Sequence, residues 1–226
     1  MDEGTASGRN AAQECPTDYW ETVAEEKTFS HPLDLERLER YAGAGARILD
    51  VGCGYGRIGA ELAHSDRYSA GAVVGIDPAA AMIARGRREH PGLDLRHGAT
   101  RPLPFASASF DVALLFAVLT SVPVDDEQRG LVAEVRRVLR QGGLVIVSDL
   151  ELQAGERHAR RYAEGERELG TRGVFRLPDG GVCRHHTPEH LRKLLGGFER
   201  LERVELDIVT MNGNPARAVQ LYARRR

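Results

Sequence analysis

The chain has 226 residues and a formal net charge of -2, from 31 Lys and Arg against 33 Asp and Glu side chains. This length suits one domain, and the content of 42% hydrophobic and 28% charged residues excludes a disordered or collagen-like chain. Because the charges nearly balance, the chain as a whole has no electrostatic attraction for nucleic acid or for an anionic membrane.

The first 42 residues divide into a tail and a helical segment. Residues 1–17 are polar and small, and we expect a flexible tail there. They lack the basic start and the apolar run of a signal peptide, and no stretch approaches the ~18 consecutive apolar residues of a membrane span. We therefore expect a cytoplasmic protein with no membrane partner. Apolar residues near helical spacing within 18–42 predict an N-terminal helix, the first part of a single domain over 18–226.

Short apolar segments alternate with helical patterns from residue 47 onwards. The expected strands cover 47–51, 72–76, 93–97, 110–116 and 144–148, and the expected helices cover 58–64, 79–89 and 128–139. Continuously apolar strands that alternate with helices predict a parallel sheet covered on both faces. After residue 150 we expect a charged helix, a small hairpin, and two more strands over 156–169, 174–184, 201–211 and 216–223. Glu156, Arg157, Arg160 and Arg161 are expected to form a solvated face of that helix. The Asn-Gly-Asn-Pro turn between the last two strands indicates that the sheet ends with an antiparallel pair.

A glycine-rich turn follows the first expected strand, and it contains two overlapping patterns. The dinucleotide pattern G-x-G-x-x-G is spelled by Gly54, Gly56 and Gly59. The pattern G-x-G-x-G, led by Asp50, is spelled by Gly52, Gly54 and Gly56. Glycines at such a turn let the backbone approach a ligand closely, and the carboxylate of Asp77, at the end of the next strand, can bind ribose hydroxyls. These features fit NAD and S-adenosylmethionine (SAM) alike.

Three observations favour SAM over NAD. The strand that precedes the glycine turn starts only at residue 47, whereas a dinucleotide fold usually begins with it. The chain has no Tyr-x-x-x-Lys pair, and its lysines are only Lys27 and Lys193. The carboxylate of Asp50 beside the turn suits a cationic sulfonium and ammonium and would repel a diphosphate.

The chain resembles class I SAM-dependent methyltransferases of the small-molecule type that carry a Leu-Pro-Phe signature. The matching segments occur in family order at 48–56, 75–78, 103–105 followed by 109–111, and 138–143. The resemblance implies an α/β fold, a Rossmann-like three-layer sandwich with a seven-stranded, mostly parallel sheet and an antiparallel C-terminal hairpin. It also implies SAM as the cofactor, bound across the carboxyl ends of the first strands.

The resemblance assigns cofactor contacts residue by residue. It places Asp50 near the methionine amino group, Asp77 at the ribose hydroxyls, and the glycines under the methionine and ribose. The family often has an Asp for the adenine amine where this chain has Ala99, so adenine recognition would use backbone, Thr100 or another side chain. The full set of expected cofactor-binding residues is Tyr19, Asp50, Gly52, Cys53, Gly54, Gly56, Asp77, Pro78, Ala99, Thr100, Phe116 and Leu119.

The resemblance implies an acceptor pocket built from an N-terminal lid in 18–42 and an acceptor-side insertion in 151–190. The expected substrate-binding residues are Trp20, Phe29, His31, Arg176, Arg184 and Asn212. The aromatic rings could lie near the sulfonium as cation–π partners, or they could simply dock the first helix on the sheet.

Candidate catalytic bases are His186, His185 and Asp149, each of which could take a proton from the acceptor. The alternatives are hydrogen-bonded hairpin histidines and a turn cap. We expect no metal, because neighbouring histidines on a strand point to opposite sides. The cysteines Cys15, Cys53 and Cys183 also lack metal-ligand or disulfide spacing.

The expected function is transfer of the methyl group of SAM to an O, N, S or C atom of a small molecule, for example in specialised metabolism. Two alternatives stay open. The enzyme could break another sulfonium bond, by aminocarboxypropyl transfer or self-cyclisation with release of methylthioadenosine, or the chain could be a non-catalytic nucleotide-binding module. We expect no nucleic-acid acceptor, because the chain has no basic groove signal and no Asn/Asp-Pro-Pro-aromatic run. We expect a monomer or homodimer.

Overall fold

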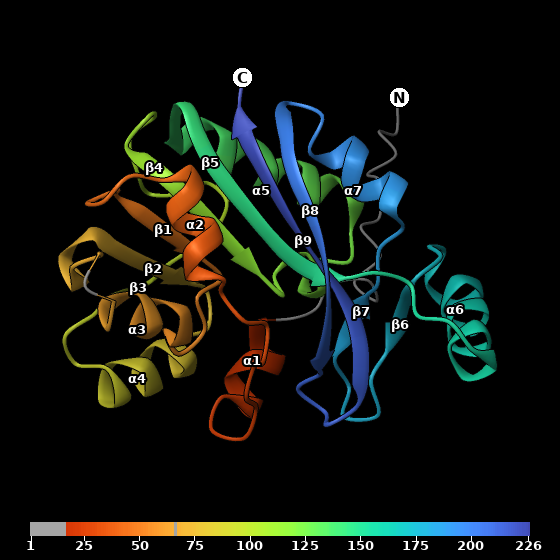
Figure 1. The fold of residues 1–226 in the computed structure, drawn as a ribbon. Helices are drawn as coiled ribbons and strands as arrows, with labels where there is room; N and C mark the ends of the chain where they lie inside the picture. The colour runs from red at the N-terminus through yellow and green to blue at the C-terminus, as the bar shows by residue number, and fades with distance from the viewer. Residues whose placement is uncertain (1–16, 66) are drawn as a thin grey trace, which may run out of the picture.

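The computed structural model describes residues 17–65 and 67–226 and contains a seven-stranded sheet in the order β3-β2-β1-β4-β5-β9-β8 (Figure 1). Only β9 runs antiparallel to its neighbours β5 and β8. The strands are β1 (Ile48–Val51), β2 (Val73–Asp77), β3 (Asp94–His97), β4 (Phe110–Phe116), β5 (Leu139–Leu150), β8 (Phe198–Val209) and β9 (Pro215–Arg225). The mostly parallel sheet with an antiparallel C-terminal hairpin is therefore confirmed.

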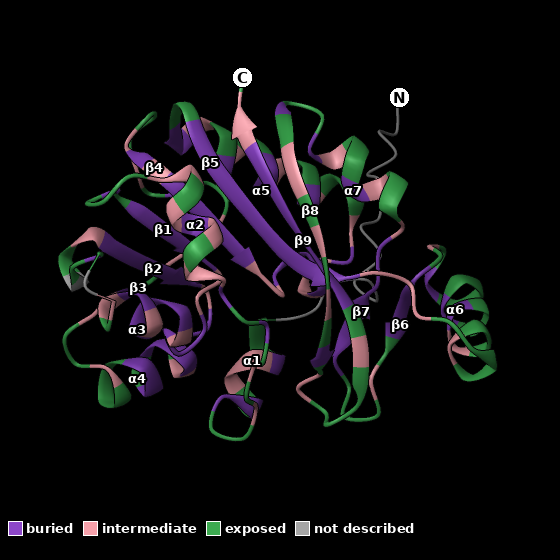
Figure 2. Ribbon diagram, in the orientation of Figure 1, coloured by how far each residue is buried: buried purple, intermediate pink, exposed green. Residues whose placement is uncertain are grey.

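Helices cover both faces of this sheet because the central strands are apolar on both sides. Along β4, Ala113 and Leu115 pack with α5 and α7, whereas Val112 and Leu114 pack with α2 and α3 on the opposite face. Figure 2 shows the result, with buried strands between half-exposed helices. The helices are α1 (Thr17–Val23), α2 (Leu35–Tyr41), α3 (Arg57–Ala63), α4 (Ala80–Glu89), α5 (Asp125–Val138), α6 (Glu156–Leu169), α7 (Pro188–Leu194), and the short 3₁₀ turns η1 (Ala70–Ala72) and η2 (Leu119–Ser121).

The N-terminal segment forms two short helices. Asp34 caps α2, since its Oδ1 accepts a hydrogen bond from the Arg37 amide at 2.9 Å, and α1 packs against α4. The tail expected over 1–17 lies outside the described residues except for Thr17, which begins α1.

Between β5 and α7, the chain forms a helix and a two-stranded sheet beyond the carboxyl end of β5. Helix α6 packs on β6 (Val174–Arg176), which pairs with β7 (Val182–Arg184) in a two-stranded antiparallel sheet. Within the described part of the chain, no helix combines the length and the apolar character needed to cross a membrane.

Candidate active site

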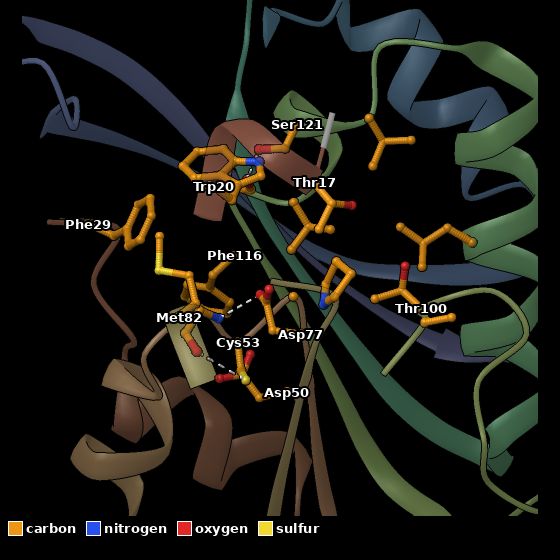
Figure 3. A pocket seen from close by; sticks show the side chains of 18 of the residues that line it. Thr17, Trp20, Phe29, Asp50, Cys53, Asp77, Met82, Thr100, Phe116 and Ser121 are labelled. Carbon is orange, nitrogen blue, oxygen red and sulfur yellow. Dashed lines mark hydrogen bonds between the residues drawn. The ribbon is translucent and has the colours of Figure 1, made fainter. Parts of the chain in front are cut away.

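A cavity of about 340 Å³ opens at the carboxyl ends of β1, β2 and β4. Nine of the twelve expected cofactor-binding residues line it, namely Asp50, Gly52, Cys53, Gly54, Asp77, Pro78, Ala99, Thr100 and Phe116. In Figure 3, Trp20 and Ser121 lie on one side of this cavity and Asp50 on the other, with Asp77 between them. We call it the cofactor cavity.

The glycine turn brings its backbone to the wall of the cofactor cavity. Gly52, Gly54 and Gly56 have positive φ angles of 67°, 56° and 81°, a conformation that glycine adopts without steric penalty. The Gly52 amide donates to the Ile76 carbonyl at 2.8 Å, which ties the turn to β2. A Cβ atom on Gly52 would stand 2.8 Å from Cγ2 of Val118, so a side chain there would displace the opposite wall.

Asp77 is held rigidly at the end of β2. Its Oδ2 accepts a hydrogen bond from the Gly54 amide and its Oδ1 accepts one from the Ala79 amide, both at 2.8 Å. Burial raises the pKa of this carboxyl to about 6, although the two backbone amides favour the ionised form. The hydrogen bonds fix the direction in which the carboxylate faces the cavity.

Asp50, at the end of the neighbouring strand β1, is 2% exposed, and burial raises its pKa to about 7. Arg57, which opposes this shift, forms its ion pair with Glu61 at 3.8 Å. Two buried carboxylates thus face one cavity, where they would be stabilised by a bound cation. The residues present fit SAM, whose amino group and sulfonium are positive and whose ribose offers two hydroxyls.

Three expected cofactor residues do not line the cofactor cavity. Tyr19 is 7% exposed and donates a hydrogen bond to Oδ2 of Asp179 at 3.1 Å, so it packs over the β6–β7 turn. Gly56 is the N-cap of α3, where its left-handed conformation lets the chain pass from the glycine turn into the helix. Leu119 is fully buried in the core beside α5, because η2 turns its side chain inward, and Val118 lines the cavity instead.

A second cavity of about 230 Å³ adjoins the first. The two share Trp20, Phe29, Ala117 and Ser121. We call it the acceptor-side cavity, and it is also lined by Ser30, His31, Thr120, Leu150, Gln153, Arg157, His158, Arg161, Phe175, Leu177, Cys183, His185, Ile208, Val209, Thr210, Met211, Asn212, Asn214, Pro215 and Ala216.

The expected substrate-binding residues separate into two groups. Trp20, Phe29, His31 and Asn212 line the acceptor-side cavity. Arg176 and Arg184 do not. Arg176 forms an ion pair with Glu168 at 2.6 Å, so its guanidinium is held against α6.

Arg184 is 5% exposed and holds η2 and α5 to β7. Its Nη1 donates to the Pro123 carbonyl at 2.8 Å, and the same atom pairs with Oδ1 of Asp125. The buried Arg184 side chain lines neither the cofactor cavity nor the acceptor-side cavity.

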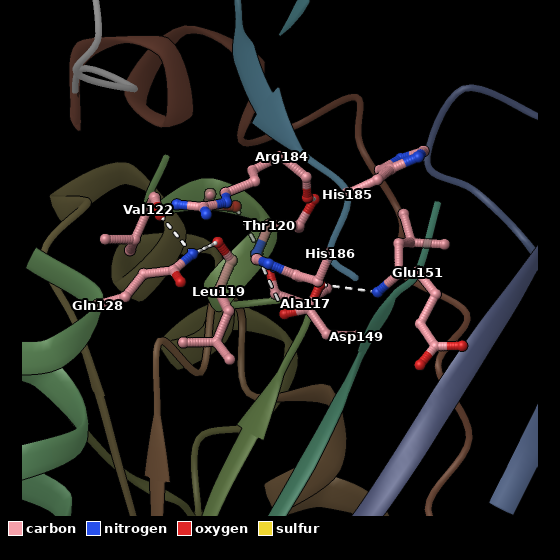
Figure 4. Close-up of polar contacts among 12 residues, drawn as sticks. Ala117, Leu119, Thr120, Val122, Gln128, Asp149, Glu151, Arg184, His185 and His186 are labelled. Atoms are coloured by element: carbon pink, nitrogen blue, oxygen red, sulfur yellow. Dashed lines mark hydrogen bonds and ion pairs between the residues drawn. The ribbon is translucent and has the colours of Figure 1, made fainter. Parts of the chain in front are cut away.

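The three candidate bases also separate into two groups, with His185 apart from His186 and Asp149. His185 lines the acceptor-side cavity, and its Nδ1 is 2.7 Å from the Tyr162 hydroxyl. Burial lowers the pKa of His185 to about 3, so its ring is neutral. In Figure 4 it points away from the other two candidates, as successive residues on a strand do.

His186 and Asp149 are buried together behind η2. Nε2 of His186 is 3.7 Å from Oδ1 of Asp149, and both side chains are fully buried. Asp149 also accepts hydrogen bonds from the Thr120 and Leu150 amides at 3.1 Å and 2.8 Å. Burial raises the pKa of Asp149 to about 7 and lowers that of His186. Neither residue lines the cofactor cavity or the acceptor-side cavity as the structure describes them, so this geometry gives neither of them access to an acceptor there.

Several residues that line the two cavities are not among those expected from the sequence. Met82, Ser121 and Glu127 line the cofactor cavity, and Arg157 and Arg161 line the acceptor-side cavity. The sequence assigns these arginines to a solvated helix face together with Arg160. Their spacing of four residues, which puts Arg157 and Arg161 on one side of α6, is the available signal.

Comparison with known proteins identifies the family. A family model described as a methyltransferase domain matches residues 49–147. A solved SAM-dependent methyltransferase of Methanosarcina mazei is 30% identical, with a TM-score of 0.77, and the match covers 85% of this chain and 99% of that one. This chain therefore belongs to the SAM-dependent methyltransferases.

Curated relatives also match part of this chain. A Mycolicibacterium smegmatis protein named "Probable S-adenosylmethionine-dependent methyltransferase" is 39% identical over 118 residues, 52% of this chain and 43% of that protein. An O-methyltransferase of Aspergillus sclerotiorum is 31% identical over 148 residues, 60% of this chain and 53% of that protein. The chain spans about half the length of these curated relatives.

Proposed function

We propose that this SAM-dependent methyltransferase transfers the methyl group of SAM to a small molecule held in the acceptor-side cavity. The observation that carries the proposal is that the two cavities meet at a shared wall of Trp20, Phe29, Ala117 and Ser121. A cofactor in one cavity and an acceptor in the other would therefore face each other there. The curated relative named as an O-methyltransferase supports oxygen as the acceptor atom.

The chain's own residues mainly bind, orient and exclude water. When bound, SAM supplies a methyl carbon that its sulfonium makes electrophilic, and transfer yields the methylated acceptor, S-adenosylhomocysteine and a proton. Asp50 would hold the amino group, and Asp77, fixed by the Gly54 and Ala79 amides, would hold the ribose hydroxyls. Trp20 and Phe29, with ring centroids 5.9 Å apart, would keep water from the junction.

Among the three candidate bases, we propose His185 as the one that contacts the acceptor and accepts a hydrogen bond from it. It is the only one of the three that lines the acceptor-side cavity. Its ring is neutral because burial lowers its pKa to about 3, so it can accept a hydrogen bond from the acceptor, whereas the same low pKa makes it a weak base and leaves the released proton to solvent. We propose that His186 and Asp149 instead stabilise the packing of β7 on η2.

Incubation with SAM and candidate acceptors, followed by mass spectrometry of both products, tests this function. The expected products are S-adenosylhomocysteine and an acceptor heavier by one methylene unit. Release of methylthioadenosine would instead mean that another sulfonium bond is broken. Tight SAM binding without turnover would favour a non-catalytic module, and thermal stabilisation by NAD but not by SAM would overturn the cofactor assignment.

The proposal also includes a cytoplasmic location, a monomer or homodimer, and no nucleic-acid partner. Size-exclusion chromatography with light scattering measures the oligomeric state. Methylation of tRNA or DNA by the purified chain at rates above those for small molecules would contradict the proposed acceptor class.

A further inference from the structure

The charges in the acceptor-side cavity have one sign. Its lining contains two arginines, Arg157 and Arg161, and no Asp or Glu among the residues that the structure describes. Both arginines come from α6, a helix that the sequence predicts to be solvated on its charged face. The cofactor cavity, in contrast, contains the buried carboxylates Asp50 and Asp77.

These two arginines are free to bind a ligand. Neither guanidinium group forms an ion pair or a hydrogen bond within residues 17–65 and 67–226, whereas that of Arg160, between them in the sequence, pairs with Glu156 at 3.2 Å. On the next strand, Arg176 pairs with Glu168 at 2.6 Å. Acidic residues therefore neutralise the neighbouring arginines and leave Arg157 and Arg161 to the cavity.

Arg161 is positioned by an aromatic ring. Its Cζ lies 4.7 Å from the centroid of Phe175, whose side chain is 3% exposed and forms part of the cavity lining. Stacking on a ring face leaves the N–H edges of a guanidinium available, and those edges match the two oxygens of a carboxylate. Phe175, Leu177 and Ile208 supply apolar surface beside this group.

Two of the histidines in the lining, His31 and His185, do not add positive charge. Burial lowers the pKa of His31 to about 4 and that of His185 to about 3, so both rings are neutral near pH 7. The positive end of the cavity is therefore at α6. In the view of Figure 1, β6 and β7 lie between α6 and α1, which carries Trp20 at the cofactor junction.

We propose that the methyl acceptor has an apolar body with one anionic group, a carboxylate or a similar oxyanion, and that Arg157 and Arg161 bind this group at the end of the cavity remote from the cofactor. This inference rests on the proposed function. The anionic group serves as an anchor and is not the atom that is methylated. Specificity would come from α6, since an acceptor without the anion would leave two guanidinium groups unpaired.

Two fluorescent probes test the proposal without knowledge of the natural acceptor. 8-Anilinonaphthalene-1-sulfonate has an apolar ring system with one sulfonate, and N-phenyl-1-naphthylamine has the same ring system without it. Each is titrated in the presence of saturating S-adenosylhomocysteine, which excludes the probe from the cofactor cavity. Energy transfer from Trp20, the single tryptophan of the chain, reports a probe bound beside the junction.

The double variant Arg157→Gln/Arg161→Gln should raise the Kd of the sulfonate probe about tenfold, the loss expected for charge-assisted hydrogen bonds. It should leave the Kd of the neutral probe unchanged, which also verifies that the cavity is intact. Arg160→Gln, on the same helix but outside the cavity, is the matched control and should affect neither probe. Arg157→Lys/Arg161→Lys should retain most of the sulfonate affinity, because it keeps both charges.

The inference is overturned if both probes lose affinity equally in the double glutamine variant, or if Arg160→Gln weakens the sulfonate probe as much. Turnover separates this failure from failure of the proposed function. Methylation of anionic acceptors with an unchanged kcat/KM in the double variant would keep the function and reject the anion site. Selective binding of the sulfonate probe, with no formation of S-adenosylhomocysteine from SAM in the presence of any acceptor, would keep the anion site and reject the function.

Discussion

The two cavities differ in how the chain builds them. The cofactor cavity is lined by residues at the strand ends and in the glycine turn. Its buried ionisable side chains, Asp50 and Asp77, are acidic. The acceptor-side cavity is enclosed by α6, the β6–β7 hairpin and the β8–β9 turn, and its charges are positive. The opposite signs of these charges suit a cationic methyl donor in the first cavity and an anionic acceptor in the second, which would meet at Trp20.

This difference indicates which part of the molecule determines SAM affinity and which part determines acceptor affinity. The cofactor cavity depends on parallel strands whose register is held by ladders of backbone hydrogen bonds. The acceptor-side cavity depends on side chains brought together from positions as distant as Trp20 and Ala216. We expect substitutions in the first to change SAM affinity and substitutions in the second to change acceptor affinity.

The largest effect is expected from Asp77→Ala. Loss of two hydrogen bonds to a charged group, at ~1.5 kcal/mol each, should weaken SAM binding about 100-fold. Isothermal titration calorimetry measures this change. Asp207→Ala, an exposed position on β8 outside both cavities, is the control. Unchanged SAM affinity in Asp77→Ala would remove Asp77 from the site.

Gly165→Ala should damage the acceptor side alone. A Cβ at Gly165 would stand 1.9 Å from the Val174 carbonyl oxygen, so α6 must move away from β6. Such overpacking costs about 1–3 kcal/mol, which outweighs the usual gain of alanine in a helix. Probe affinity in the acceptor-side cavity should fall while SAM affinity persists.

The matched control for Gly165→Ala is Gly92→Ala, where a Cβ meets nothing within 4 Å. Thermal unfolding and the two fluorescent probes measure both variants. Equal loss of SAM affinity and probe affinity in Gly165→Ala would show that the two cavities are not separable.

SAM affinity should rise with pH between about 5.5 and 7.5. Burial raises the pKa of Asp50 to about 7 and that of Asp77 to about 6, so part of each carboxyl is protonated in the free protein at the lower pH. A bound cation favours the ionised forms and releases those protons, which strengthens binding by up to about tenfold per pH unit for each proton. Calorimetry in buffers of different ionisation enthalpy counts the protons.

In the same pH series, Asp77→Asn should flatten the profile, because it removes one titrating group. A wild-type profile that is flat over this range would mean that both carboxylates are already ionised in the free protein.

The smallest effect is expected from His186→Asn, which should change kcat by less than about twofold because the side chain lines neither cavity. His185→Asn is the comparison, since His185 does line the acceptor-side cavity. Steady-state kinetics with thermal unfolding separate catalysis from folding. A large loss of kcat in His186→Asn with an unchanged melting temperature would restore His186 as a catalytic residue.

The fold and most of the cofactor site are predictable from the sequence because their signals are local. Alternating apolar strands and helices specify the sheet, and the glycine turn with Asp50 and Asp77 identifies its ligand-binding edge. Leu119 shows the limit of this reasoning. It follows β4 as expected, but the 3₁₀ turn rotates its side chain into the core and leaves Val118 at the wall.

By itself, the sequence determined the methyltransferase family, the mostly parallel seven-stranded sheet with its antiparallel C-terminal hairpin, and the carboxylates that line the cofactor cavity. Only the tertiary structure decided which arginines line the acceptor-side cavity. Arg157, Arg160, Arg161, Arg176 and Arg184 have the same chemistry, and neutralisation of three of them depends on Glu156, Glu168 and Asp125. Such pairing depends on helix rotation and on contacts across the chain, which residue spacing alone does not specify.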